Sequence, residues 1–149
     1  MSDRTSAGRT RRGSRTARVI ALTIGASYVV AGTWAFLAPA SFFGSVAAFP
    51  PYNQHLLHDV GAFQVGLGVI LLLGATTRAA LQPALLAVLA ASLLHVASHV
   101  EDRALGGHPS DPLILALVCV LLAAGLVLER RATAPAPGTG RQGAGGAAR

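Results

Sequence analysis

Four long apolar runs occupy the middle of this 149-residue chain and constrain its fold more than any other feature. They cover residues 19–38, 54–76, 79–100 and 112–129. A bilayer core of about 30 Å needs about 20 helical residues to cross it, and each run meets or approaches that length. The strict alternation of apolar and polar residues that indicates strands is missing from these runs. The sequence therefore predicts an all-α fold, an integral membrane protein built as an antiparallel four-helix bundle.

The charged residues are few and lie mostly at the two ends of the chain. They make up 12% of the sequence, against roughly 25% in a typical soluble domain. Residues 1–17 are rich in Arg, Ser and Thr, and residues 132–149 in Ala, Gly and Pro, so both are expected to be disordered tails. The domain of four membrane-spanning helices then covers residues 18–131. Because the basic residues flank apolar runs, they indicate a membrane surface and not nucleic acid.

The distribution of arginine predicts the orientation of the chain. With four spans, eleven of the twelve arginines fall on one side, in the two tails, next to the tails at the ends of the spans, and in the turn at Arg78, and only Arg103 falls on the other. Loops rich in arginine stay in the cytoplasm. We therefore expect a multi-pass protein of the plasma membrane with both termini cytoplasmic.

All five histidines and four of the six acidic residues then lie on the outer side. His55, His58 and Asp59 are three and four positions apart, so they share one face of the second helix, and His95 and His99 share one face of the third. Counting from the turn between these helices places Asp59 level with His95. The two polar faces are therefore expected to meet.

A converging group of imidazoles and a carboxylate allows more than one chemistry. It suits a transition metal such as zinc, iron or copper, and we predict His55, His58, Asp59, His95 and His99 as candidate metal ligands. Paired histidines from two helices also suit axial ligation of haem, and imidazoles near neutral pH suit proton transfer. The structural alternative is a hydrogen bond from His95 to Asp59 that locks the helical hairpin. No catalytic residue and no particular cofactor is assigned.

The connections between the apolar runs carry their own signals. Pro39 is expected to end the first helix, and Asn53 to cap the second. Residues 40–49 are apolar and uncharged, which predicts a loop in the outer interface. The turn around Thr77 is so short that the second and third helices must be neighbours.

Small residues predict which helix faces come together, because they allow helix backbones to approach closely in lipid. Gly25 and Gly32 lie one heptad apart on the first helix. Ala62, Gly66 and Gly74 are spaced by four and eight positions on the second helix. Both sets are expected at helix contacts.

The string PYNQHLLHDVGA at residues 51–62, which opens a helix, and His95-x3-His99 near the end of the next helix carry a resemblance. Together they resemble uncharacterised four-helix membrane proteins of actinobacteria, which are similar in layout to the broader DoxX-like group. The resemblance covers roughly residues 19–128. It implies a four-helix bundle in the plasma membrane and accessory redox work, in some members linked to quinones. It implies no catalytic residue.

The sequence thus favours an accessory or structural membrane component with an outer-face His/Asp site over an enzyme. The alternative is a redox subunit associated with a metal, haem or quinone. A small transporter is the second alternative, disfavoured because transporters place polar groups near the midplane on several or broken helices. The expected partners are the lipid bilayer and other membrane proteins or quinone, with no nucleic acid.

Overall fold

The computed structural model describes residues 14–134, and this part of the chain is helical apart from short turns and loops. Its helices are α1 (Arg15–Leu37), α2 (Pro39–Ser45), α3 (Gln54–Gly74), α4 (Arg78–Glu101) and α5 (Asp111–Thr133). All except the short α2 are long and apolar enough to cross a membrane. The predicted all-α membrane bundle of four antiparallel helices is confirmed.

Side-chain caps and prolines set the helix ends. Ser14 and Thr77 cap α1 and α4 by accepting backbone N–H groups of the first turn. Asn53 does the same for α3, with its Oδ1 3.1 Å from the backbone nitrogen of Leu56. Helix α1 ends at Leu37, and Pro39 opens α2. The predictions for Pro39 and Asn53 are confirmed.

Two boundaries differ from the expectation. Helix α1 begins at Arg15, four residues before the predicted start, because the Ser14 cap lies upstream of the apolar run; disorder is therefore wrong for residues 15–17. Helix α5 continues to Thr133, so disorder is also wrong for residues 132–133, and its basic last turn complements the helix dipole. Part of the expected interface loop at 40–49 forms α2. The rest of the two predicted tails, residues 1–13 and 135–149, lies outside the described residues.

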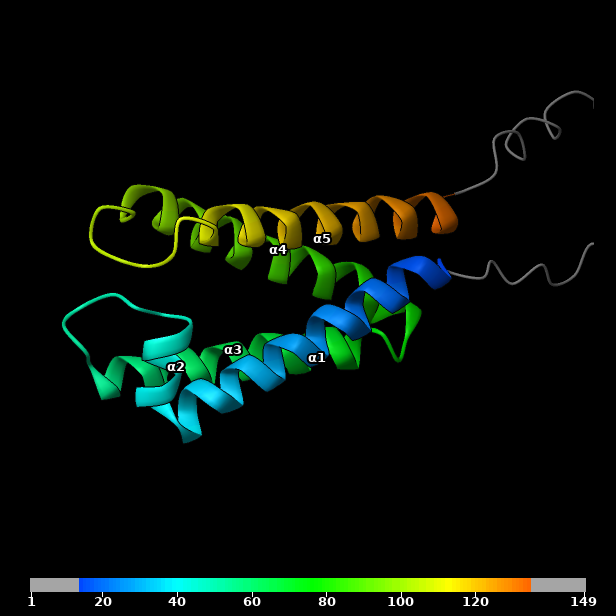
Figure 1. Ribbon diagram of the computed structural model, residues 1–149. Helices are drawn as coiled ribbons and strands as arrows, with labels where there is room; N and C mark the ends of the chain where they lie inside the picture. Colours follow the sequence, from blue (N-terminus) through cyan, green and yellow to red (C-terminus); the bar gives the residue numbers. More distant parts are fainter. Residues whose placement is uncertain (1–13, 135–149) are drawn as a thin grey trace, which may run out of the picture.

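The four long helices form two pairs, α1 with α3 and α4 with α5 (Figure 1). Contacts of α3 with α4 and of α1 with α5 join the pairs, so the second and third spans are neighbours as predicted. One end of the bundle holds the start of α1, the α3–α4 turn and the end of α5, and we call it the termini end. The other holds α2, the start of α3 and the loop at 102–110, and we call it the loop end.

Two glycine pairs bring the backbones of α1 and α3 into direct contact, and we call this contact the glycine seam. A Cβ atom on Gly32 would lie 2.6 Å from the carbonyl oxygen of Gly61, and one on Gly68 would lie 2.7 Å from that of Gly25. Within each helix the two glycines are seven residues apart, Gly25 and Gly32 on α1 and Gly61 and Gly68 on α3. Each pair therefore lies on one face of its helix. No larger residue fits there without separating the helices.

The seam confirms the prediction for α1 and corrects that for α3. Gly25 and Gly32 are contact residues as expected. On α3, however, Ala62 is exposed and Gly66 faces open space. Gly74 does lie at a contact, against Ala84 of α4. The spacing of small residues on α3 admits two faces, and the heptad that matches α1 is the one used.

The apolar core is concentrated toward the termini end. Its largest fully buried apolar side chains come from α3, α4 and α5: Leu71, Leu81, Leu85, Val88 and Leu122. At the loop end a separate, smaller cluster holds only Ala35, Phe42 and Leu57 as buried residues. The loop end is therefore less completely filled, and the cavities described below lie there and in the adjoining part of the bundle.

Candidate functional site

The predicted site residues of α3 contact one another or α1. His55 Nε2 lies 3.6 Å from Asp59 Oδ2, one helical turn away, and the two side chains are 86% and 53% exposed. The His58 ring packs against the Phe36 ring of α1, with centroids 5.0 Å apart. The polar face of α3 is thus a pair at the surface beside a histidine that packs on α1.

The predicted residues of α4 form a second pair, and the partner of this pair, Asp111, is not among the five predicted ligands. His95 Nε2 and His99 Nε2 are 3.1 Å apart, within hydrogen-bond distance. His99 Nδ1 lies 3.9 Å from Asp111 Oδ2, at the start of α5. The Phe49 ring meets the His99 ring edge-on at 5.3 Å. His95, His99 and Asp111 therefore follow one another in a line, which we call the His–His–Asp line.

The expected meeting of the two faces is not observed. Among residues 14–134, neither His55 nor Asp59 forms a hydrogen bond or ion pair with His95 or His99. Equal distance from the turn fixes depth along the helices but not rotation, and the glycine seam turns α3 toward α1. In place of the expected Asp59–His95 hydrogen bond, the structure has the His55–Asp59 ion pair within α3 and the His95–His99 hydrogen bond within α4.

The same geometry bears on the metal hypothesis. Within the described part of the chain, no three His, Cys, Asp or Glu side chains are arranged to hold one metal ion. Protein zinc sites use three or four such ligands. The assignment of a metal to these residues therefore stays a prediction, and the described contacts offer two adjacent ring nitrogens, not a complete ligand set.

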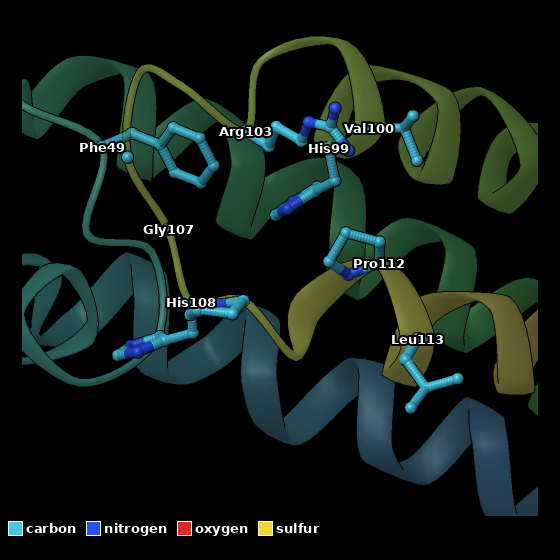
Figure 2. A pocket seen from close by; sticks show the side chains of 10 residues that line it. Phe49, His99, Val100, Arg103, Gly107, His108, Pro112 and Leu113 are labelled. Carbon is cyan, nitrogen blue, oxygen red and sulfur yellow. The ribbon is translucent and has the colours of Figure 1, made fainter.

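A cavity of about 510 Å³ opens beside His99, and we call it the loop-end cavity. Its walls include Phe49, Arg103, Gly107 and Pro112. Figure 2 shows the Phe49 and His99 rings extending toward each other, with Arg103 beside His99. The His99 ring thus reaches a space at the loop end of the bundle.

Backbone contacts hold this cavity in shape. The N–H of Gly107 donates to the carbonyl of Ala48 at 3.0 Å. Gly107 has a φ of 80°, which glycine adopts without a steric penalty. A Cβ atom there would lie 2.7 Å from the Phe49 ring. The loop at 102–110 is therefore tied to the segment before α3, and Phe49 is held against His99.

A second cavity of about 220 Å³ lies between α1, α3 and α4, and we call it the side cavity. His95 and Gln64 line it, together with Tyr28 and Ser92. The Tyr28 hydroxyl and Ser92 Oγ form a buried hydrogen bond of 2.9 Å. Each histidine of the bonded pair therefore lines a different cavity.

The sequence pattern could have identified some of these polar residues but not others. Ser92, His95 and His99 are spaced by three and four positions, which places them on one face of α4, so Ser92 had a detectable signal. Tyr28 is a single aromatic in an apolar run. Asp111 is separated from His99 by a loop. Neither residue has a local pattern that indicates its partner.

The termini end holds a polar group inside the fold. Glu129 is fully buried, and its Oε2 accepts the N–H of Ser14 at 2.7 Å. Its Oε1 has no hydrogen-bond partner among the described residues. A carboxylate at the start of α1 also interacts favourably with the helix dipole. Glu129 thus joins the end of α5 to the start of α1.

The fold and the apolar faces of its helices define a multi-pass α-helical membrane protein. Comparisons with protein families, with characterised proteins and with solved structures found no match to the chain.

Proposed function

We propose that this chain is an accessory protein of the plasma membrane whose His–His–Asp line exchanges protons between the water at the loop end and the interior of the bundle. The observation that carries this proposal is the 3.1 Å separation of the Nε2 atoms of His95 and His99, together with the two cavities that the two rings line.

The orientation in this proposal places the loop end outside the cell. At the termini end the structure describes five arginines, Arg15, Arg18, Arg78, Arg130 and Arg131. At the loop end it describes Arg103 alone. Arginine-rich segments remain on the cytoplasmic side, so this distribution supports cytoplasmic termini.

The position of Asp111 assigns a tautomer to each ring. A separation of 3.9 Å is too long for a hydrogen bond, but the carboxylate still favours a proton on the nearer nitrogen, His99 Nδ1. His99 Nε2 is then the acceptor, and His95 Nε2–H is the donor. A proton taken up at His95 Nδ1 allows the Nε2 proton to pass to His99, whose Nδ1 proton leaves toward Asp111 and the loop-end cavity.

The proposed exchange is confined to one end of the bundle. On the termini side of the buried Tyr28–Ser92 hydrogen bond, α4 and α5 fill the centre of the bundle. The side chains there are Leu85, Val88 and Leu122, which are fully buried. An apolar layer of this kind does not pass protons, because it offers no hydrogen-bond partners. The line therefore serves a reaction partner within the bilayer and does not conduct across it. A quinone-linked partner, which the DoxX-like resemblance implies, fits that role.

Metal binding is the second candidate function, and one distance favours it. Two nitrogens that coordinate the same tetrahedral zinc at about 2.0 Å lie about 3.3 Å apart, close to the 3.1 Å between the two Nε2 atoms. The remaining ligands would come from a partner or from water. Haem is disfavoured for this pair, because axial ligands approach the iron from opposite faces and these two rings touch directly.

Nitrogen NMR of the full chain in lipid nanodiscs, with ¹⁵N-labelled histidine, tests the proton line. We expect a scalar coupling between His95 Nε2 and His99 Nε2 across the hydrogen bond, and a protonated Nδ1 on His99. The coupling should vanish in His95→Gln and persist in His55→Gln, the matched control on α3. Absence of the coupling in the wild-type chain refutes the line, and its loss on adding stoichiometric zinc supports the metal alternative.

A further inference from the structure

The loop-end cavity has the size of a small-molecule site and a lining of one electrostatic kind. Its volume of about 510 Å³ lies within the range of roughly 300–1,000 Å³ typical of ligand pockets. The ionisable side chains that line it are His99, Arg103 and His108, all of which carry positive charge when ionised. Figure 2 shows the His108 ring turned away from His99. Both His99 nitrogens face His95 and Asp111, so the cavity presents Arg103 to an occupant.

Arg103 is available for such an occupant. It is exposed, and among the described residues it forms no ion pair. The neighbouring acids Glu101 and Asp102 do not line the cavity. Asp111 also lies outside the lining, and its Oδ2 accepts the N–H of His108 at 2.8 Å while facing His99. A guanidinium group has five N–H donors suited to the oxygens of phosphate or carboxylate.

The cavity also has an apolar side that faces the lipid. Val100 and Leu113 line it and are 50% and 75% exposed. Both belong to the loop-end turns of membrane-spanning helices, α4 and α5. This is the level at which the hydrocarbon core gives way to headgroups. An occupant at this level meets the Arg103 guanidinium on one side and acyl chains on the other.

We propose that the loop-end cavity binds a phosphate group, with the Arg103 guanidinium as its principal contact. A phospholipid headgroup and free inorganic phosphate share this chemistry, and the experiment separates them. The site does not depend on proton exchange, because Arg103 takes no part in the His–His–Asp line.

The test measures lipid retention by the full chain. Wild-type protein is reconstituted in nanodiscs of phosphatidylcholine with a minority of phosphatidylglycerol, released into a mild detergent and examined by native mass spectrometry. We expect one retained phosphatidylglycerol per chain. Arg103→Gln should weaken this retention about tenfold, since it removes charge-assisted hydrogen bonds. Arg103→Lys should keep part of it, and Arg78→Gln, an exposed arginine at the termini end, should keep all of it.

The outcomes separate the two sources. Arg103-dependent retention that millimolar inorganic phosphate does not displace identifies a lipid headgroup. Calorimetric binding of inorganic phosphate that needs Arg103, without a preference for phosphatidylglycerol, identifies the free anion. Equal retention and equal phosphate binding in Arg103→Gln and Arg78→Gln overturn the proposal. Val100→Trp, which fills the cavity with Arg103 intact, gives an independent reading: binding should fall, and unchanged binding contradicts the site.

Discussion

The two ends of this bundle differ in where their polar groups lie. At the termini end a single carboxylate, Glu129, is fully buried and joins two helices that are far apart in sequence. At the loop end the polar groups of the His–His–Asp line lie beside cavities. A buried carboxylate with a backbone partner holds elements in place, whereas imidazoles beside a cavity can exchange protons and contact ligands. This difference is why the proposed proton exchange is placed at the loop end, while Glu129 is assigned a role in holding the fold.

The largest expected effect concerns the close packing at the termini end. In Gly74→Val the new Cβ atom would lie 2.5 Å from the Ala84 Cβ. We expect unfolding of the detergent-solubilised chain by dodecyl sulfate to show a loss of about 3 kcal/mol, the upper part of the range for overpacking. Gly44→Val is the control at the loop end, where a Cβ meets no atom within 4 Å. Equal stabilities in the two variants would contradict the claim that the termini end is packed more closely than the loop end.

A smaller loss is expected at Glu129. Glu129→Ala leaves the Ser14 N–H without its acceptor and α1 without a carboxylate at its start. Leaving a donor without its partner costs about 1–3 kcal/mol, so we expect a loss of about 2 kcal/mol in the same unfolding measurement. The neighbouring exposed residue provides the control, Arg130→Ala, which should change stability by less than about 0.5 kcal/mol. A neutral Glu129→Ala would show that the buried carboxylate does not join α1 to α5.

The buried hydrogen bond of the side cavity should contribute less. Tyr28→Phe removes the hydroxyl that contacts Ser92 at 2.9 Å. We expect a loss of about 1 kcal/mol, the typical net value for a neutral hydrogen bond. A double-mutant cycle with Ser92→Ala isolates the interaction. Strictly additive losses in the double variant would mean that the two hydroxyls do not interact.

The smallest effect is expected at the exposed pair of α3. His55 is 86% exposed at the side chain, so His55→Ala should change stability by less than about 0.5 kcal/mol. It should also leave the ¹⁵N coupling between His95 and His99 unchanged. Loss of that coupling would show that His55 influences the His95–His99 pair. The polar faces of α3 and α4 would then form one cluster, as the sequence predicts from their equal depth.

The sequence was sufficient for the architecture because lipid imposes strong and local constraints. Run length, the Asn53 cap and the position of Pro39 each predict a feature that the structure has. The site was predicted only in part. Helical spacing correctly paired His95 with His99, but rotation about the α3 axis depends on the Gly61 and Gly68 contacts with α1, and no local pattern distinguishes these contacts from alternatives on the same helix.

Contacts between residues distant in sequence account for the remaining differences. Asp111 reaches His99 only because the loop at 102–110 folds back, and Gly107 enables this by bonding to Ala48. Glu129 meets Ser14 across 115 positions of sequence. Each contact depends on how whole helices pack, which single-sequence periodicity does not determine.

The glycine seam has a mechanical consequence for the whole molecule. Helices whose backbones touch at two points seven residues apart cannot slide or roll against each other without a clash. The pair α1–α3 should thus move as one rigid body. Conformational changes should then occur where this pair contacts α4 and α5. The side cavity is lined by residues of α1, α3 and α4, so a change in the tilt of the α1–α3 pair against α4 should change the volume of that cavity.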